Sequence, residues 1–497
     1  MSTASKCARR SGQAQTVLLG VIFFCVPGMW NAITSMAGGL DSPSMAGAAT
    51  AAVYGTGAFT SLFASLPCNI LGPRVTLFVG TLGYWLYVLS LLMYKLGATG
   101  APLVVAAGAI NGCCCGLLWV AHGQLMYTYA GADGRGVLFG LFWLVFSLGA
   151  VTGGLLSFGE NFDDDSGAQT SVGTFVTFVG LMTLGSCLVG LLESPAHVIR
   201  LDGTRPPVSA PVAVCAELRA MGRLLLDRRS LALAPCFIFS NWFYAFQFTC
   251  FNARVFDART QGLNNTFYWG AQMVGTVLFG RWLDAPSVSP RRRALRALVV
   301  CFALVALTWI LALFMSHSLD LDGEPAPSHT SKSGEAPPPA PPSRPLRSRL
   351  DALRSPSEWA APFAVYVGWG VIDAFVQTYS FWIIGQLDDD PQVLGRFTGI
   401  YRCLQSGGAA VSWVLSTLSW DCGGRCAGPV PPTAQAWINI IVGMASLPGT
   451  ILLAMTLDER PHEKALSASV FTAPDRADGL LAAEPDEADR VRLALPP

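Results

Sequence analysis

Charged residues are scarce in this chain of 497 residues. Asp, Glu, Lys and Arg make up 13% of it, whereas an average soluble domain has about 25%. Apolar residues make up 52%, and the formal net charge is zero. A zero net charge gives no basic field that would attract nucleic acid. The excess of apolar over charged residues indicates a multi-pass membrane protein whose surroundings are the lipid bilayer.

Signatures of catalysis and of cofactor binding are also lacking. The sequence has no Gly-rich loop ending in Lys-Ser/Thr that would cradle phosphates, and no His/Cys cluster with metal-ligand spacing. The fourteen Cys residues are mostly scattered through apolar stretches, as small buried hydrophobes are. Cys422 and Cys426 flank a short loop, CGGRC, and a disulfide between them is predicted if that loop faces an oxidising compartment. We therefore expect no enzyme activity, no catalytic residue, no metal site and no cofactor.

Twelve stretches are long and apolar enough to cross a hydrocarbon core, which takes about 20 residues of helix. The fold class that we predict is an all-α polytopic membrane protein with twelve transmembrane helices in two six-helix halves. The predicted spans are Gln15–Met36, Met45–Leu66, Val75–Leu96, Ala101–Tyr127, Gly136–Phe158, Val172–Glu193, Leu231–Phe251, Leu263–Leu283, Ala294–Met315, Trp359–Gly385, Arg396–Leu418 and Gln435–Leu457.

Basic residues and low-complexity segments give the orientation and the domain organisation. With the N-terminus placed inside, most Lys and Arg fall on the inside, which predicts that both termini are cytosolic. Within the linker, AVCAELRAMGRLLLDRR is predicted as an amphipathic helix at the membrane surface. Plasma membrane and vacuolar membrane both remain open. The predicted parts are a cytosolic segment 1–14, a first half 15–193, a cytosolic linker 194–230, a second half 231–457 with a Pro-rich outside loop 316–356, and a cytosolic tail 458–497.

Two inside turns at equivalent places in the two halves carry a related pattern. The first, SLPCNILGPR, contains Asn69, Gly72 and Arg74, and the second, GRWLDAPSVSPRRR, contains Gly280 and Asp284. Both are similar to the Gly-x-Leu-x-Asp-x-x-Gly-x-Arg turn of the major facilitator superfamily. In the first turn of this chain, Asn69 stands at the position where that turn usually has Asp. Two interpretations are open. The Asp or Asn caps or pairs across the halves, or the turns are simply tight and flanked by inside positive charges.

Longer stretches are similar to one family in particular. The runs Arg259–Asn265 (RTxxLNN) and Tyr401–Ala409 (YxxxQSxGA) are fairly specific. With the stretches that surround them, they resemble the fungal branch of the uncoordinated-93-like (UNC-93-like) family, part of the major facilitator superfamily. The resemblance covers about residues 15–457 outside the Pro-rich insert. Its stretches are Val17–Gly39, Asn69–Tyr94, Phe251–Asp284 and Tyr379–Trp413.

The resemblance implies the major facilitator fold and leaves two classes of function open. Members of the family are described as transporters, so it implies secondary transport of an unidentified small solute or cation. Animal relatives are described as ion-channel regulators or trafficking chaperones, so the alternative is a non-transporting partner of another membrane protein. The family tends to place a basic residue soon after the position of Trp413. This chain continues VLST there and lacks that contact.

Polar side chains lie inside the predicted spans, where a charged group costs about 2.5–3.5 kcal/mol on insertion scales. Asp373 and Gln377 are four residues apart and share a helix face, and Arg402 and Gln405 share a face in the next span. Three interpretations are open: an Asp373–Arg402 pair, a structural polar network, or a role in substrate or ion coupling. Arg402 also lies near enough to the inside to extend its head to the surface.

The other candidates lie in spans seven and one. Asn241, Tyr244 and Gln247 are spaced by three residues and are roughly co-facial, and Asn252 follows them. Asn31 follows a Pro-Gly pair that predicts a kink. Helix-to-helix hydrogen bonding is the alternative to a binding role in span seven, and a simple packing kink is the alternative in span one. The substrate or ion-coupling candidates are Asp373 (as the proton or cation site), Gln377, Arg402, Gln405, Asn31, Asn241, Tyr244, Gln247 and Asn252.

Overall fold

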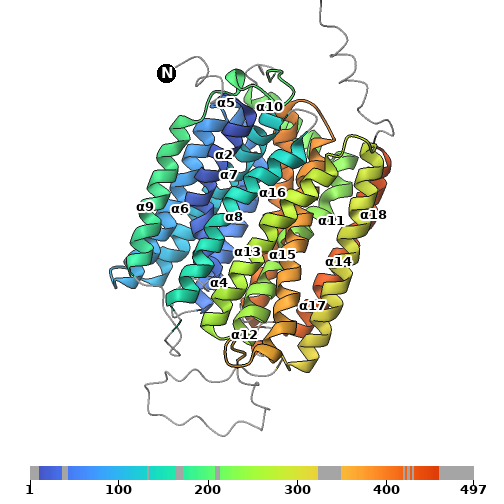
Figure 1. Ribbon diagram of the computed structural model, residues 1–497. Helices are drawn as coiled ribbons and strands as arrows, with labels where there is room; N and C mark the ends of the chain where they lie inside the picture. Colours follow the sequence, from blue (N-terminus) through green and yellow to red (C-terminus); the bar gives the residue numbers. More distant parts are fainter. Residues whose placement is uncertain are drawn as a thin grey trace, which may run out of the picture.

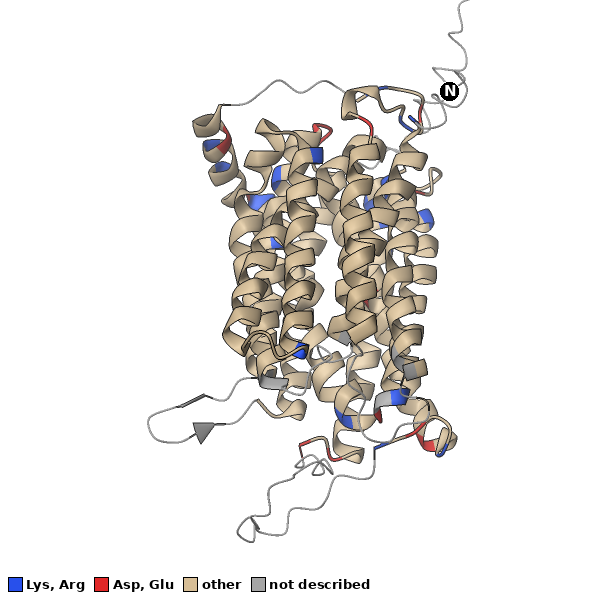
Figure 2. Ribbon diagram, turned by 90° about the vertical axis from the view of Figure 1, so that its left-hand side faces the viewer, with Lys and Arg blue, Asp and Glu red and all other residues tan. Residues whose placement is uncertain are grey.

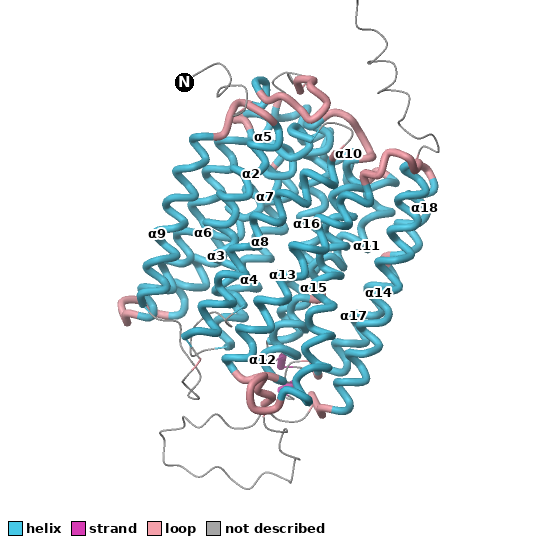
Figure 3. Tube along the Cα trace, viewed as in Figure 1, coloured by secondary structure: helices cyan, strands magenta, loops and turns pink. Residues whose placement is uncertain are grey.

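The structure, a computed structural model, describes residues 10–35, 43–130, 134–160, 162, 172–206, 213–322, 349–417, 420–421, 426–427 and 430–457. Here the chain is almost entirely helical, and its long helices run side by side between two ends (Figure 1, Figure 3). We call the end that carries α5 (Ser65–Ile70) and α10 (Val214–Leu225) the linker end. The opposite end, which carries α12 (Ala253–Val255), is the far end.

The first half of the chain crosses between the two ends six times. The first crossing is interrupted at Pro27, whose missing N–H opens the helical ladder into a π-helical turn. The crossings are α2 (Gly12–Phe23) continued by the π-helix η1 (Phe24–Gly28) and α3 (Met29–Ser35), α4 (Pro43–Phe63), α6 (Pro73–Lys95), α7 (Ala101–Ala130), α8 (Arg135–Glu160) and α9 (Val172–Leu188) with η3 (Val189–Leu191).

The linker then passes through η4 (Pro195–His197) and α10 into six further crossings. The seventh crossing also contains a π-helical turn, η5. Two-residue strands β1 (Trp420–Asp421) and β2 (Cys426–Ala427) pair antiparallel at the far end. The crossings of the second half are α11 (Arg228–Trp242) with η5 (Phe246–Asn252) and α12, α13 (Ala258–Leu283), α14 (Pro290–Ser318), α15 (Pro356–Gly385), α16 (Pro391–Thr417) and α17 (Pro432–Ala445) with α18 (Leu447–Met455).

Each of the twelve predicted spans falls on one of these crossings, and most of the helices begin a few residues earlier than predicted, α13 and α16 by the largest margin. α13 begins at Ala258 rather than Leu263, because the Asp257 side chain accepts a hydrogen bond from the Thr260 amide and caps the helix. α16 begins at Pro391 rather than Arg396, since proline favours the first position of a helix. The extension of α13 brings Arg259 into its first turn, whereas the residues added to α16 are uncharged.

Helices that lie between the halves are less apolar than the rest. By length and apolar composition alone, nine helices in the described part of the chain could cross a membrane. The other three crossings are α4, α13 and α16. α13 packs against α8 of the first half, and α16 packs against α4. Helices covered by protein need fewer apolar side chains than helices covered by lipid. Lys and Arg otherwise gather toward the two ends of the bundle (Figure 2).

Glycines allow α8 and α13 to approach closely at both ends. Near the linker end, Gly136 of α8 faces Gly280 of α13, and a Cβ on either would overlap the backbone of the other. Near the far end, Gly154 faces Gly262, where an added Cβ would lie 3.0 Å from the opposite carbonyl oxygen. The backbones of the two halves therefore touch directly, with no side chain between them.

We expect Gly280→Ala to destabilise the protein by about 1–3 kcal/mol, because the methyl group must push α8 and α13 apart. The matched control is Gly270→Ala on the same helix, where an added Cβ meets nothing within 4 Å. Thermal unfolding in detergent measures both variants. Equal melting temperatures for the two variants would show that the close approach contributes nothing.

Candidate functional site

A cavity lies at the centre of the bundle, between the two halves. Its wall is rich in aromatic rings, and side chains of both halves contribute to it. Six of the nine predicted site residues line it: Asn31, Asn241, Tyr244, Gln377, Arg402 and Gln405. The other three, Asp373, Gln247 and Asn252, do not line it.

Asp373 lies one layer behind the cavity wall, and its side chain is completely buried. Its Oδ2 accepts hydrogen bonds from the Tyr244 hydroxyl at 2.8 Å and from Gln272 Nε2 at 2.6 Å. The Tyr268 hydroxyl lies 3.1 Å from the same oxygen, and Gln377 Nε2 lies 3.2 Å from Oδ1. The carboxyl group is therefore surrounded by neutral donors, and Tyr244 and Gln377 separate it from the cavity.

Gln272 connects Asp373 to the first half of the chain. Its Nε2 donates to Asp373, while its Oε1 accepts a hydrogen bond of 2.9 Å from Trp143 Nε1. Trp143 belongs to α8 of the first half and lines the cavity, whereas Gln272 belongs to α13 of the second half. A change at the carboxyl group of Asp373 can therefore reach the contact between the halves through one side chain.

Arg402 does not pair directly with Asp373, and it does not extend to the surface. Its guanidinium lies over the rings of Trp119 and Tyr401, at 4.3 and 4.8 Å from the ring centres. Only 7% of the residue is exposed. Arg402 donates to Gln405 Oε1 at 2.5 Å, Gln405 Nε2 lies 3.1 Å from Gln377 Oε1, and Gln377 reaches Asp373. Two glutamines thus separate the two opposite charges.

Gln247 and Asn252 do not line the cavity, although they lie in the π-helical turn η5 together with Phe248, which does. Phe248, four residues after Tyr244, keeps the cavity face that Asn241 and Tyr244 share, whereas Gln247 and Asn252 bond to α13. Gln247 Oε1 accepts from the Tyr268 hydroxyl at 2.9 Å and lies within the network behind the wall. Asn252 joins a separate network with two asparagines of α13, Asn264 and Asn265.

At the linker end, the predicted turn residue Asn69 meets a carboxylate from α10. Asn69 Nδ2 donates to Glu217 Oε1 at 2.9 Å, and Ser65 Oγ lies 3.1 Å from the same oxygen. Arg396 of α16 donates to both oxygens of Glu217, at 2.9 and 2.6 Å. The Glu217 side chain is fully buried. Glu217 therefore binds Asn69 of the first half and Arg396 of the second half. It supplies the carboxylate that the superfamily turn usually carries at the position of Asn69.

The second turn makes the corresponding contact from the other half. Asp284 Oδ2 accepts from the Val137 amide at 2.7 Å, in the first turn of α8, and Trp382 Nε1 donates to Oδ1 at 3.2 Å. A carboxylate at a helix N-terminus satisfies an otherwise unpaired amide. In the first turn, Gly72 has a φ of 88°, which favours glycine, and Arg74 donates to the Gly190 carbonyl.

Burial raises the pKa of the Asp284 carboxyl from its usual 3.8 to about 6. The folded protein therefore binds a proton at Asp284 more tightly than the unfolded chain does, and its free energy of unfolding falls as pH rises from about 4 through about 6. We expect Asp284→Asn to remove this slope. Melting temperatures across that range measure it, with Asp202→Asn on the exposed linker as the control. An unchanged slope in Asp284→Asn would contradict this assignment.

Several residues of these networks were missed by sequence reasoning, among them Tyr268, Gln272, Glu217, Trp143 and Ser65. Tyr268 and Gln272 lie on α13, and Glu217 lies in the linker helix, which was predicted to rest on the membrane surface. Gln272 could have been found by the same criterion as the predicted site residues, because it is a polar residue inside a predicted span. Cys422 lies outside the residues that the structure describes, so the disulfide stays a prediction. In the described residues, no group of three or more His, Cys, Asp or Glu could hold a metal ion.

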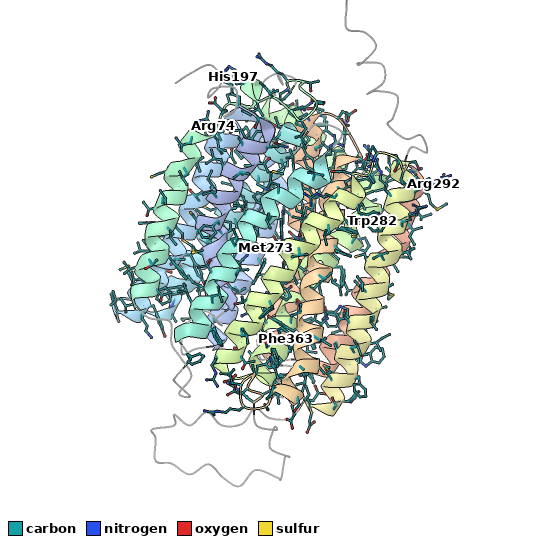
Figure 4. All side chains as sticks on the ribbon, viewed as in Figure 1. Arg74, His197, Met273, Trp282, Arg292 and Phe363 are labelled. Carbon is teal, nitrogen blue, oxygen red and sulfur yellow. The ribbon has the colours of Figure 1, made fainter. Side chains whose placement is uncertain are left out.

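Figure 4 marks the two ends of this arrangement on the ribbon. Arg74, His197 and Arg292 lie at the linker end, and Phe363 of α15 lies toward the far end. Met273, next to Gln272 in sequence, lies midway along α13. The buried carboxyl groups of Glu217 and Asp284 thus join the halves at one end, and Asp373 lies near the centre.

Comparisons with known proteins give consistent results. A family model described as "Ion channel regulatory protein UNC-93" matches residues 43–317. UNC93-like protein 1 of Arabidopsis thaliana is 35% identical over 453 residues, which cover 91% of this chain and 92% of that protein. An UNC93-like protein of Schizosaccharomyces pombe is 30% identical, over 82% of this chain and 77% of that protein. Because the plant protein is more similar to this chain than the yeast protein is, membership of the fungal branch stays a prediction.

Two solved structures have the same arrangement of helices. The proton:xylose symporter XylE matches with a TM-score of 0.57 and 12% identity, over 92% of this chain and 97% of that one. The transporter FucP, in its outward conformation, matches with a TM-score of 0.55 and 14% identity, over 90% of this chain and 99% of that one. Both are named as major facilitator superfamily proteins. At such low identity the likeness shows the fold alone.

Proposed function

Because the chain belongs to the UNC-93 family and has the major facilitator fold, we propose that it is a secondary transporter. It moves an unidentified small solute or ion across a membrane by alternating access, in which the two halves rock about a central site. The cavity between the halves is that site, and Asn31, Asn241, Tyr244, Gln377, Arg402 and Gln405 provide its polar groups. The energy comes from an ion gradient.

One observation carries this proposal: a hydrogen-bond chain joins the buried Asp373 to the cavity and to the other half. Tyr244 and Gln377 connect Asp373 to the cavity wall, and Gln272 connects it to Trp143 of the first half. A proton on Asp373 would weaken its bonds from the neutral donors and so loosen the contact between Gln272 and Trp143. Ion binding and movement of the halves would then be coupled through a single buried group.

The linker end is proposed to face the cytosol, with both termini on that side. Arg228 and Arg229 at the start of α11 and the run Arg291–Arg293 at the start of α14 place positive charge there. Positive charge favours the cytosolic side of a membrane. Glu217 and Asp284 would then close the cytosolic end and leave the far end to open first. The plasma membrane and the vacuolar membrane are both consistent with this orientation.

Spin labels on the two halves at the linker end test alternating access without a known substrate. Leu71→Cys and Arg292→Cys provide the labelling sites, since both side chains are exposed. The thiols that are exposed in the described part of the chain, Cys113, Cys187 and Cys215, are replaced by Ser. We expect two distances between the labels, with a ratio that changes between mildly acidic and mildly alkaline pH.

Two further variants assign the pH response. Asp284→Asn removes the titrating carboxyl of the linker end, and the response should persist in that background. Adding Asp373→Asn should abolish it and leave one fixed ratio. A single distance at every pH, in the parent and in Asp373→Asn alike, would contradict a transport cycle.

A second function is favoured by the description of the matching family model, which names an ion channel regulatory protein. A regulator would keep its halves closed, use Asp373 only for packing, and bind its partner through loops or lipid-facing surfaces. It therefore gives one distance between the spin labels, and an ion channel should co-purify with the chain from its native membrane. Co-purification together with two pH-dependent distances would support both functions.

A further inference from the structure

The central cavity carries one positive charge that no acid of the described chain neutralises. Arg402 lines the cavity, and no carboxylate in the described residues forms an ion pair with it. Its partners are the Gln405 amide oxygen and the rings of Trp119 and Tyr401. Its Nε is buried and has no hydrogen-bond acceptor. A buried guanidinium that lacks an acid is an incomplete site for an anion.

Two further donors in the same wall also lack acceptors. The indole Nε1 atoms of Trp30 and Trp269 are buried and unpartnered, and both residues line the cavity. Trp30 belongs to the first half and Trp269 to the second. Because a buried donor without an acceptor is unfavourable, a ligand that brings acceptor oxygens would be stabilised by all three groups. The unsatisfied groups of the cavity, Arg402 Nε and the two indole Nε1 atoms, are all hydrogen-bond donors. A ligand that fits them must therefore supply acceptors.

The remaining wall is suited to an apolar or aromatic body. Trp143, Phe146, Phe248 and Tyr54 surround the polar groups, and they offer ring faces and edges. The acid nearest in the network, Asp373, lies behind Tyr244 and Gln377 and does not line the cavity. A cation in the cavity would therefore meet the charge of Arg402 before it met any carboxylate.

We propose that the cavity binds an organic monoanion: a carboxylate on an apolar or aromatic body, with its charge held by Arg402 and its oxygens by the indoles of Trp30 and Trp269. The proposal rests on the proposed function and names the substrate class of that site. The carboxylate accepts from the guanidinium, while the body packs against the rings. Asp373 remains available as the separate group that takes up a proton or cation.

Isothermal titration calorimetry of the full chain in lipid nanodiscs tests the proposal with three matched probes. They are 2-naphthoate, neutral 2-naphthamide and cationic 2-naphthylmethylammonium, which share one ring system. We expect 2-naphthoate to bind at least about tenfold more tightly than 2-naphthamide, because it adds charge-assisted hydrogen bonds. The cationic probe should show no binding. Tighter binding of the cationic probe, or no binding of 2-naphthoate, would overturn the proposal.

Variants assign the binding to the three donors. Arg402→Gln should weaken 2-naphthoate binding by roughly 10- to 100-fold and leave 2-naphthamide binding unchanged. Trp269→Phe keeps the ring and removes one donor, so it should weaken 2-naphthoate binding by about 2- to 10-fold. Arg281→Gln, an exposed arginine at the end of α13, is the control and should bind as the parent does. Unchanged 2-naphthoate affinity in Trp269→Phe and in Arg402→Gln would overturn the assignment.

A further variant covers the case in which Arg402→Gln does not fold. The spin-label distances separate a failure of the substrate class from a failure of the transport proposal. If Arg402→Gln does not fold, Arg402→Lys should retain the preference for 2-naphthoate over 2-naphthamide at reduced affinity, because lysine keeps the charge and loses the planar donors. Loss of that preference in a folded Arg402→Lys would count against the proposal. Two label distances without 2-naphthoate binding would reject only the substrate class. Binding with a single distance would reject transport and leave an anion-binding regulator.

Discussion

Replacing Glu217 with Gln should lower the free energy of unfolding by about 3–5 kcal/mol, the usual cost of removing one partner of a buried ion pair. Glu217 accepts from Arg396, Asn69 and Ser65, and its side chain is fully buried. A neutral amide at this position would leave the guanidinium of Arg396 without a counter-charge. Only 11% of the Arg396 side chain is exposed, so water compensates little for that loss. Thermal unfolding in detergent gives the measurement.

A double-mutant cycle separates the pair from general damage. Glu217→Gln with Arg396→Gln should be more stable than Glu217→Gln alone, since no buried charge is then left unpaired. Glu358→Gln, an exposed change of the same kind in the first turn of α15, is the control and should have no effect. If the double variant is as unstable as the sum of the two single variants, Glu217 and Arg396 do not act as a pair.

Replacing Asp373 with Leu should cost about 2–6 kcal/mol, because two buried donors lose their only acceptor at about 1–3 kcal/mol each. These donors are the Tyr244 hydroxyl and Gln272 Nε2. Tyr268 and Gln377 keep other acceptors, so they contribute less. Expression yield and thermal unfolding measure the loss, and Asp373→Asn should cost less because its amide oxygen still accepts.

Removing one of the orphaned donors should restore part of this stability. In the double variant Asp373→Leu and Tyr244→Phe, the orphaned hydroxyl is removed, and Gln272 is kept because its Oε1 is the acceptor of Trp143 Nε1. We expect this variant to fold better than Asp373→Leu alone and to lack the pH response of the label distances. If instead Asp373→Leu is as stable as the parent, the hydrogen bonds around Asp373 are not structurally important.

The crossings and the central charged groups could be predicted from local patterns. Runs of apolar residues located all twelve crossings, and a spacing of four placed Gln377 beside Asp373, where their side chains lie 3.2 Å apart. The direct Asp373–Arg402 pair could not be decided, because it depends on which side chains intervene. Gln377 and Gln405 lie between them, a consequence of how α15 and α16 pack rather than of either sequence alone.

Long-range partners and register changes were beyond sequence reasoning. Glu217 lies 148 residues after Asn69 in the chain, and nothing in either segment indicates that one supplies the acid that the other lacks. An amphipathic linker helix predicts an exposed charged face, yet this glutamate is covered by both halves. Within the π-helical turn η5, Phe248 keeps the cavity face while Gln247 and Asn252 bond to α13, which residue spacing alone did not indicate.

The low apolarity of α4, α13 and α16 also bears on how the chain enters the bilayer during synthesis. On the translocon-insertion scale, an arginine near the centre of a helix costs about 2.5–3.5 kcal/mol. α16 carries Arg402 and Gln405 within its length, so it has little tendency to insert by itself. Its neighbour α4 belongs to the first half and is synthesised long before it. We therefore expect the face of α4 that packs against α16 to stay uncovered until α16 has been synthesised. During that interval the nascent chain would depend on translocon-associated chaperones.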